Sequence, residues 1–367
     1  MLKFHPLQIA EIRPDAEDAV RIALDVPEAL REEYRMRPGQ HVVLRANVNG
    51  EELRSTYSLI SRPEGTRLEI APRLHPKARL ATHLAQKARV GDTVEVLPPN
   101  GSFGPRENTP KGTFLAFAAG CGITPVFAIV RSLLEAAPGN RVQLVYGNRN
   151  VGRTMLLEEL MALKDRHLGR FTISFVMSGE PQDIELFNGR IDAAKLDELG
   201  ETLLDPRKAE GIFVCGPGTM IDDITAKLRA LGVDAARIHS EHFRAAAAPA
   251  AASAVPAPQA SPAASPQVKP AADGVTQVTV VMDGRRRVFP MRKEEETILD
   301  AAARAGLDLP FSCRAGVCST CRTRLVRGEV RMDQNFALEE WELEQGYILA
   351  CQSHAKTDEL ELNYDER

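Results

Sequence analysis

Four cysteines near the C-terminus have the residue type and spacing to bind iron. Cys313, Cys318 and Cys321 follow the pattern C-x4-C-x2-C, and Cys351 comes after 29 further residues. This spacing is typical of plant-type [2Fe–2S] sites and differs from the C-x2-C-x2-C pattern of bacterial sites. Structural zinc sites usually pair two hooks of the C-x2-C or Cys/His kind, whereas here one loop carries three cysteines. The spacing therefore predicts a [2Fe–2S] site, with zinc or unligated cysteines as the alternative.

The residues around these cysteines support the same prediction. The loop from Phe311 to Cys321 is rich in small residues, which let backbone N–H groups approach the cluster sulfurs and raise the reduction potential. Before it, the pattern predicts a hairpin that turns at Asp283-Gly284 and a helix over Thr297–Ala305. Over its last 90 residues or so the chain resembles plant-type ferredoxins, which implies a β-grasp-like fold.

A second candidate site surrounds a tyrosine in the first third of the chain. The segment from Arg54 to Ser58 reads R-S-T-Y-S and resembles the R-x-Y-S motif of the ferredoxin–NADP reductase family. The resemblance implies FAD binding, with Tyr57 packed on the isoalloxazine ring and acting in catalysis. Thr56 and Ser58 are the expected FAD contacts beside it. An ordinary tyrosine of a β-barrel is the alternative interpretation of Tyr57.

The chain departs from this motif at the arginine that contacts the FAD phosphates. The motif places it two residues before the tyrosine, where this chain has Ser55. Arg54 lies one residue further back, and on a strand it would point to the opposite face. Arg54 therefore remains an open candidate, and Arg73 or Arg79 is expected to supply the missing charge.

A further element of that family is a G-x-x-S segment that opens a helix. Here it reads A-R-L-A from Ala78 to Ala81, so alanine replaces both the glycine and the serine. Backbone N–H groups at a helix N-terminus bind phosphate without help from those side chains. We expect Ala81 to contribute in this way and Thr82 to lend a hydroxyl.

The nicotinamide site is expected where a strand runs into a helix at residues 118–125. The segment reads A-A-G-C-G-I-T-P, and its small residues and the helix N-terminus suit a pyrophosphate. It resembles the family form G-x-G-I-T-P, which implies that Gly120, Gly122, Thr124 and Pro125 contact the cofactors, with Thr124 near the flavin. Cys121 is interpreted as a packing residue.

A second cysteine segment should face the nicotinamide. Residues 214–220 read V-C-G-P-G-T-M and resemble the family's C-G-P motif. The resemblance implies that Cys215 lies beside nicotinamide C4, where the hydride leaves, and that Gly216, Pro217 and Met220 line the same site. A buried strand cysteine is the alternative. Phe243, which ends the segment S-E-H-F, occupies the position of an aromatic that closes over the flavin in relatives.

Arginines follow the second strand of this region, where the adenosine ribose should lie. An acidic residue there favours NAD, whereas arginine accommodates a 2′-phosphate. Asn148, Arg149 and Arg153 occupy this stretch, and arginine pairs well with phosphate. The sequence therefore predicts NADPH as the reductant, with surface arginines that bind no ligand as the alternative.

The elements that must hold these residues follow distinct patterns along the chain. Residues 1–107 contain short alternating runs between Gly and Pro turns, which predicts an antiparallel β-barrel for FAD. Residues 108–244 alternate buried strands with helices, which predicts an α/β parallel-sheet domain for the nucleotide. Residues 245–273 are almost all Ala, Pro and Ser and predict a linker. Residues 274–367 form the expected ferredoxin domain of this multidomain chain.

Individual elements are also expected. The strands are Ala19–Asp25, His41–Arg45, Thr56–Ile60, Arg67–Ile70, Asp92–Val96, Thr113–Ala118, Arg141–Tyr146, Phe171–Met177 and Gly211–Cys215. The helices are Pro125–Ala136, Thr154–Asp165 and Gly218–Ala230.

Composition narrows the class of protein and partner. Net charge is −4, and residues 274–367 hold 13 Lys and Arg against 17 Asp and Glu. An acidic module argues against a nucleic-acid partner and allows docking on a basic protein face, although it also suits a merely solvated surface. No apolar run approaches the ~20 residues that span a bilayer, and no signal peptide opens the chain. We therefore expect a cytoplasmic protein without a membrane partner.

The chain as a whole resembles one group of reductases. The segments F-H-P-L at residue 4, D-V-P-E at residue 25 and R-P-G-Q-H at residue 37 are similar to the reductase subunits of phenylacetyl-CoA epoxidase complexes. The resemblance implies that electrons pass from NADPH through FAD and a [2Fe–2S] centre to a multisubunit diiron oxygenase. A reductase for a ring-hydroxylating or alkane oxygenase is the alternative. A redox-sensing iron–sulfur module without turnover is a more distant one.

Overall fold

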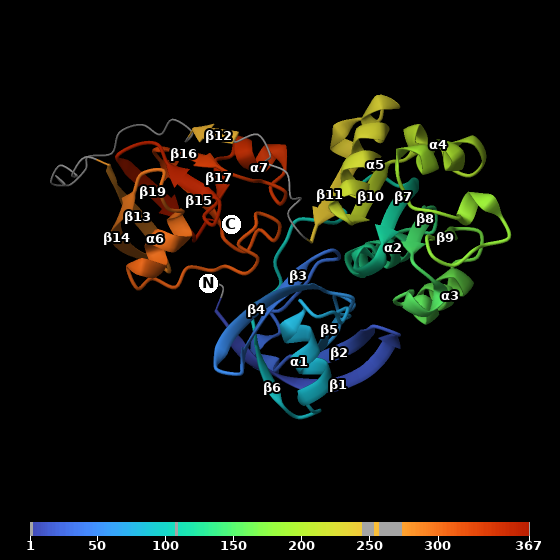
Figure 1. Ribbon diagram of the computed structural model, residues 1–367, viewed down its shortest axis with the longest axis horizontal. Coiled ribbons are helices and arrows are strands. Elements are labelled where there is room, and N and C mark those ends of the chain that lie inside the picture. Colours follow the sequence, from blue (N-terminus) through green and yellow to red (C-terminus); the bar gives the residue numbers. More distant parts are fainter. Residues whose placement is uncertain (1–2, 107–108, 244–252, 257–273, 367) are drawn as a thin grey trace. The chain divides into compact units, whose positions relative to one another are not determined.

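The computed structural model describes residues 3–106, 109–243, 253–256 and 274–366 (Figure 1). The chain divides into two compact units, of which the larger covers Lys3–Phe243 and the smaller includes the C-terminal cysteines. In the described part of the chain, no helix has both the length and the apolar character that crossing a membrane requires.

The first part of the larger unit is a six-stranded antiparallel barrel with the strand order β4-β3-β6-β1-β2-β5. Its strands are β1 (His5–Ala16), β2 (Ala19–Asp25), β3 (His41–Val48), β4 (Glu51–Ser58), β5 (Arg67–Ile70) and β6 (Thr93–Val96). A bridge between Leu59 and Ile70 joins the end of the β4 segment to β5 and closes the sheet. Helix α1 (Arg79–Lys87) buries Leu80 and Leu84 in the apolar core of the barrel.

The second part of the larger unit is a five-stranded parallel sheet with helices packed against it. Its elements are β7 (Thr113–Ala119), α2 (Ile123–Ala136), β8 (Arg141–Asn148), α3 (Leu157–Arg166), β9 (Phe171–Met177), α4 (Ala193–Thr202), β10 (Gly211–Gly216), α5 (Gly218–Ala230) and β11 (Ile238–His242). The strand order is β11-β10-β7-β8-β9. The chain therefore reverses direction across the sheet between β7 and β10, and ligands of such sheets bind at the carboxyl ends of the strands at this point.

The smaller unit contains a five-stranded sheet with the order β14-β13-β19-β15-β17 and a three-stranded sheet with the order β12-β16-β18. Its elements are β12 (Ser253–Pro256), β13 (Val275–Met282), β14 (Arg285–Arg292), α6 (Ile298–Arg304), β15 (Arg322–Arg327), β16 (Glu329–Met332), α7 (Glu340–Glu344), β17 (Tyr347–Leu349), β18 (Ser353–Ala355) and β19 (Glu359–Asn363). The expected hairpin is present. Asp283 and Gly284 both have positive φ, 55° and 66°, as a two-residue type I′ turn requires.

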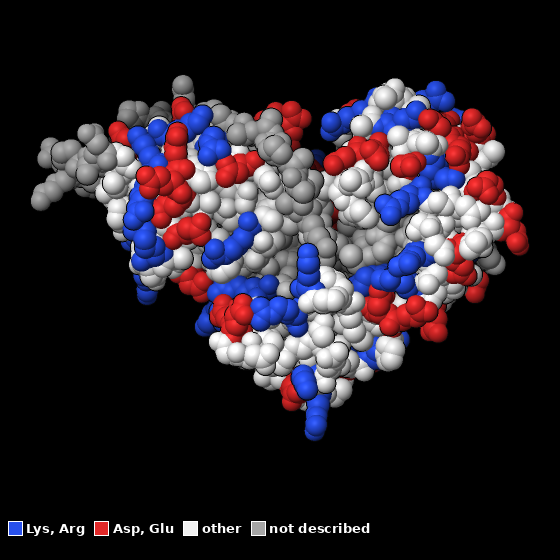
Figure 2. Space-filling view, viewed as in Figure 1, with Lys and Arg blue, Asp and Glu red and all other residues white. Residues whose placement is uncertain are grey.

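Charged side chains hold the barrel and the α/β part together. Arg21 of β2 is nearly buried and bonds both Glu69 of β5 and Glu159 of α3. Arg131 of α2 donates to the carbonyl oxygen of Ser61 in the barrel. Figure 2 shows basic and acidic side chains side by side over the region where the barrel strands approach α3.

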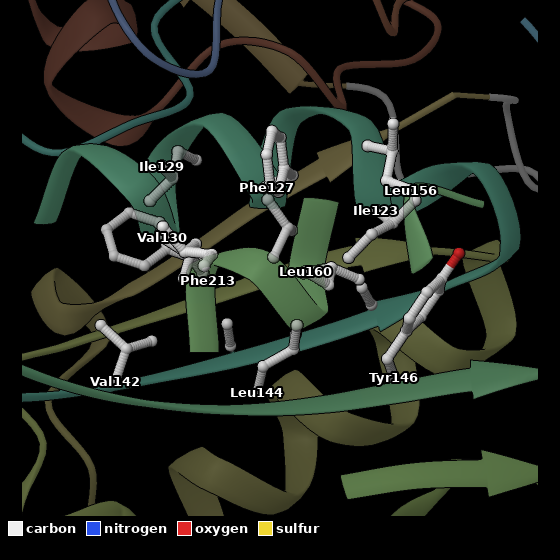
Figure 3. Packing of buried hydrophobic residues seen from close by; sticks show 14 of the residues in the cluster. Ile123, Phe127, Ile129, Val130, Val142, Leu144, Tyr146, Leu156, Leu160 and Phe213 are labelled. Carbon is white, nitrogen blue, oxygen red and sulfur yellow. The ribbon is translucent and has the colours of Figure 1, made fainter. Parts of the chain in front are cut away.

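The two parts of the larger unit also share one apolar core. Helix α2 presents Ile123 and Val130 toward β8 and Phe213, as Figure 3 shows. Phe103, at the end of the barrel segment, meets Phe213 edge to face with ring centroids 6.0 Å apart. A core built from both parts means that the barrel and the parallel sheet pack as one body.

The element predictions agree with the structure best where one apolar pattern dominates. Strands β2, β5 and β9 and helix α5 have the expected bounds. Strand β1 was not expected, because Pro6 and Pro14 interrupt its alternation. Within the expected linker, the described residues 253–256 form strand β12, which pairs with β16, and the rest of that segment lies outside the described residues.

Candidate functional site

The four C-terminal cysteines converge from two segments of the smaller unit. Cys313 and Cys318 lie in the loop between α6 and β15, Cys321 directly precedes β15, and Cys351 is the second residue after β17. Their thiols form two hydrogen-bonded pairs, one between Cys313 and Cys318 and one between Cys321 and Cys351. All but Cys313 are at least nine-tenths buried.

This pairing bears on whether the site suits one metal ion or two. A zinc ion would need all four sulfurs ~2.3 Å away, and so within about 4 Å of one another. Among the described residues, no three Cys, His, Asp or Glu side chains gather closely enough to hold a single ion. Two hydrogen-bonded thiol pairs, close enough that Cys318 also acts on Cys321 and Cys351, instead suit two neighbouring irons with two cysteines each. The arrangement therefore fits a [2Fe–2S] cluster better than zinc.

Backbone donors surround the same sulfurs. The N–H of Ala315 donates to Cys313 Sγ at 3.3 Å, and the N–H of Gly316 donates to Cys351. Gly316 has φ 72°, and a Cβ there would come 2.9 Å from the carbonyl oxygen of Gln334, so only glycine fits the loop. The predicted role of small residues in this loop is consistent with these contacts.

The protonation of the pairs fits a metal site as well. Hydrogen bonding to the neighbouring thiol, followed by burial, raises the pKa of Cys313 and of Cys321, whereas the hydrogen bond from Cys321 lowers the pKa of Cys351. Four thiolates held this close therefore need a compensating positive charge, which bound iron supplies.

The residues of the expected flavin site divide between the two faces of β4. Ser55 and Tyr57 share one face, because side chains alternate along a strand. They hydrogen-bond each other, and burial raises the pKa of Tyr57 to about 12. Arg54 lies on the other face with Thr56 and Ser58, where its Nε donates to Glu52 Oε1 at 2.9 Å. The side chain of Arg54 therefore does not share the face of Tyr57.

The other two candidate arginines of the flavin site have different environments. Arg73 bonds the Asp18 carboxylate and donates to the carbonyl oxygen of Arg153 at 2.9 Å. Arg79 is half-exposed at the start of α1 and donates to Glu51 Oε2 at 2.7 Å. Glu51 is the first residue of β4 and shares the face of Ser55 and Tyr57. Arg79 therefore lies on the side where the expected flavin phosphates would need a charge.

The first residues of α1 have backbone N–H groups that make no hydrogen bond within the helix. Ala78 caps the helix without a side-chain hydrogen bond, and the N–H of Thr82 is the first to bond within it. The N–H groups of the first three helical residues, including that of buried Ala81, thus have no partner inside the helix.

The two expected nicotinamide segments touch each other. A Cβ on Gly122 would overlap the carbonyl oxygen of Cys215 and lie 2.8 Å from the nitrogen of Gly216. The loop after β7 and the end of β10 therefore pack backbone against backbone, at the point where the strand order reverses. Thr124 Oγ1 donates to the carbonyl of Cys121 at 2.9 Å, and Pro125 is buried behind it.

On the β10 side, Met220 packs over Gly216, where a Cβ would lie 2.7 Å from the Met220 Cε. Pro217 is the cap of α5 and directs the chain from the strand into the helix. Asn148, at the end of β8, is buried; its side chain lies within reach of the Tyr146 hydroxyl, but its Nδ2 makes no hydrogen bond of full geometry among the described residues. A buried amide so weakly engaged at this edge of the sheet fits a polar ligand.

Cys215 is fully buried and faces charged neighbours. Burial, and after it the charge of Glu241, raises the pKa of Cys215 well above its ordinary value, so it stays a neutral thiol near pH 7. Glu241 pairs with Cys215 across β10 and β11, and its Oε1 lies 3.7 Å from His41 Nδ1 of the barrel. Phe243 is half-buried and packs against the shared core that includes Cys215.

His41 and Glu241 were not predicted as site residues. Each lies in a segment noted in the sequence, R-P-G-Q-H and S-E-H-F, but 200 residues separate them. Their approach depends on how the barrel packs against β11, and no local pattern reports that packing.

The expected adenosine end contains one engaged and one exposed arginine. Arg153 bonds the carboxylate of Asp18 in the barrel. Arg149 is exposed, and in the described part of the chain its side chain makes no hydrogen bond or ion pair. Its Cγ lies against Gly179, where a Cβ would come within 2.8 Å. Glu180, which was not predicted, accepts the N–H of Val151 at 2.7 Å beside it.

Comparison with known proteins assigns each of these regions. Residues 7–104 match the oxidoreductase FAD-binding domain, residues 117–226 the oxidoreductase NAD-binding domain, and residues 280–356 the 2Fe-2S iron-sulfur cluster binding domain. The chain is therefore an oxidoreductase whose domains bind FAD, NAD(P)H and a [2Fe–2S] cluster. This confirms the predicted fold class and cofactor classes.

Similarity to individual proteins extends over the whole chain. It is 38% identical to a subunit of the 1,2-phenylacetyl-CoA epoxidase of Escherichia coli (strain K12), covering 100% of this chain and 99% of that one. It is 31% identical to the 3-ketosteroid-9-alpha-monooxygenase ferredoxin reductase component of Rhodococcus rhodochrous, covering 98% and 96%. Its fold matches phthalate dioxygenase reductase with TM-score 0.57 at 24% identity, covering 98% of both chains. The chain thus belongs to the family of iron–sulfur flavoprotein reductases that includes this subunit of 1,2-phenylacetyl-CoA epoxidase.

Proposed function

We propose that this chain is the reductase of a multisubunit diiron oxygenase that epoxidises the ring of phenylacetyl-CoA, with NADPH as the electron donor. The observation that carries the proposal is 38% identity, over the full length, to the epoxidase subunit of Escherichia coli. When bound, FAD accepts the two electrons of a hydride, and the [2Fe–2S] cluster carries them one at a time. The reducing cytoplasm, which keeps the four cluster thiols reduced, is the proposed location.

The chain's own residues prepare the hydride-transfer site. The contact between Gly122 and Cys215 fixes the floor on which the nicotinamide would rest. Cys215 stays neutral there, so it places no negative charge against the ring. The half-buried ring of Phe243 packs against the core that includes Cys215, and that of Tyr57 packs against the barrel core; each would exclude water on its own side of the bound cofactors.

The oxygenase partner is the part of the proposal that a direct experiment must test. The full chain, carrying an affinity tag, is purified from cells grown on phenylacetate. We expect a diiron oxygenase to co-purify, because electron delivery requires docking. Salt should weaken the complex if the acidic C-terminal module docks by charge. Recovery of a ring-hydroxylating or alkane oxygenase instead would favour the alternative partner, and recovery of neither would contradict the proposal.

The proposed preference for NADPH depends on Arg149. It is exposed at the carboxyl end of β8, where the adenosine ribose of a dinucleotide lies in sheets of this order. Arg149→Ala should lower kcat/KM for NADPH about tenfold or more, because an arginine–phosphate pair is lost. The value for NADH should change less than about threefold. Equal losses with both reductants, or equal kcat/KM of the unaltered enzyme with both, would contradict this preference.

Arg79 is the proposed counter-charge of the FAD phosphates. It lies at the uncapped start of α1, on the face of β4 that carries Ser55 and Tyr57, and its only partner among the described residues is the exposed Glu51. Arg54 lies on the opposite face, and Arg73 is held by the less exposed Asp18. A charge there complements the free N–H groups of the helix N-terminus.

FAD affinity of the flavin-free protein tests this role without turnover. Arg79→Ala should weaken FAD binding about tenfold, as loss of a charged hydrogen bond does. Adding Ser55→Arg to that variant should restore it, because the new arginine would share the face of Tyr57. Arg54→Ala is the matched control and should change the affinity less than about threefold. A larger loss from Arg54→Ala than from Arg79→Ala would contradict the assignment.

A further inference from the structure

The turn between β1 and β2 contacts the loop that follows β8, although one belongs to the barrel and the other to the parallel sheet. The N–H of Glu17 donates to the carbonyl oxygen of Gly152 at 2.9 Å. The N–H of Leu156 donates to the carboxylate of Asp15 at 3.1 Å. Leu156 is fully buried and has φ 57°, a conformation that costs a non-glycine residue about 1–2 kcal/mol. The barrel therefore helps to fix this loop in a strained shape.

Asp18 lies at the centre of this contact. Its two carboxylate oxygens accept from different arginines, Oδ1 from Arg73 of the barrel and Oδ2 from Arg153 of the loop. Arg73 also donates to the carbonyl oxygen of Arg153 at 2.9 Å. The Asp18 and Arg73 side chains are 21% and 15% exposed, so water screens this pair less than it screens a surface ion pair.

The guanidinium of Arg153 is therefore held toward the barrel. Its backbone is held as well, because its N–H donates to Asn150 Oδ1 at 3.0 Å. Arg149 differs, since it is exposed and makes no ion pair in the described part of the chain. Arg149 directly follows β8 and Arg153 ends the short 3₁₀ turn Val151–Arg153, so the two arginines belong to the same loop and differ in what engages their side chains.

We propose that Asp18 is a specificity-determining residue for the dinucleotide, because it withholds Arg153 from the 2′-phosphate and leaves Arg149 to bind it. This inference rests on the proposed preference for NADPH. It assigns a role in cofactor selection to a carboxylate that lies in the barrel, outside the matched NAD-binding residues 117–226. Without the Asp18 charge, Arg153 is released and the local positive charge increases by one.

The experiment measures binding of adenosine 2′,5′-bisphosphate and of 5′-AMP to the purified full chain by calorimetry. These probes differ by the 2′-phosphate and lack the nicotinamide, so binding is read without turnover. Asp18→Asn should tighten the bisphosphate about five- to tenfold, as a new arginine–phosphate pair does, and change 5′-AMP less than about twofold. Asp18→Glu keeps the charge and is the matched control, for which neither affinity should change more than about twofold.

Arg153→Ala then separates release of Arg153 from a general change of charge. In the Asp18→Asn background it should abolish the gain, and in the unaltered chain it should change bisphosphate affinity less than about twofold. A gain that survives Arg153→Ala would mean simple electrostatics and would overturn the proposal. So would a loss from Arg153→Ala alone, or no gain in Asp18→Asn.

Two further measurements distinguish failure of the Asp18 proposal from failure of the NADPH preference and from misfolding. Failure of the NADPH preference itself would appear in the unaltered chain, as equal affinity for the two probes, and in an Arg149→Ala variant without effect. Failure of the Asp18 proposal would appear only in the variants of Asp18 and Arg153. Unchanged FAD content and melting temperature of Asp18→Asn would show that folding is intact.

If Asp18→Asn does not fold, the single variant Arg153→Ala still tests the proposal. A loss of bisphosphate affinity in that variant would mean that Arg153 already binds the 2′-phosphate, and so that Asp18 does not withhold it.

Discussion

The close approach of Gly122 to the Cys215 carbonyl is the constraint on which the larger unit depends. It brings the loop after β7 against the end of β10, at the point where the strand order reverses and where ligands of such sheets bind. The barrel approaches the same edge of the sheet through His41, which faces Glu241 of β11. A side chain at residue 122 would push the loop after β7 away from the end of β10, and so disturb the pairing of these two strands. The proposed site for hydride transfer thus depends on backbone packing more than on any single polar side chain.

Charge distribution explains how the larger unit stays one body while it binds two dinucleotides. The seam between the barrel and the parallel sheet is closed by paired charges, such as Arg21 with Glu159 and Asp18 with Arg153. Exposed Arg149 remains available for phosphate, and uncapped α1 offers backbone donors. In the smaller unit the thiols form two pairs, which favours two irons over a single ion. Each cofactor region therefore presents groups whose charge or hydrogen bonding a ligand would complete.

The sequence predicted the elements with strong local patterns and the residues in short motifs. The cysteine spacing predicted the kind of domain that the family match assigns to residues 280–356, and the period of two along β4 already placed Arg54 opposite Tyr57. The pairing of Cys321 with Cys351 could not be predicted, because it depends on how β17 returns to the loop. The same holds for Asp18 and Arg153, which are 135 residues apart and meet only when the barrel packs on the sheet. Local patterns report which face a residue occupies, whereas contacts between domains require the folded chain.

The central claim is that electrons enter beside Cys215 and leave through the loop from Cys313 to Cys321. NADPH-dependent reduction of ferricyanide and of cytochrome c by Cys313→Ser tests it most directly, with Arg314→Lys in the same loop as the control. The account predicts that Cys313→Ser keeps ferricyanide reduction and loses that of cytochrome c, while Arg314→Lys keeps both. Full cytochrome c reduction by Cys313→Ser would contradict the account, because electrons would then bypass the cluster. Loss of both activities would indicate misfolding, and absence of turnover in the unaltered chain would favour a sensor.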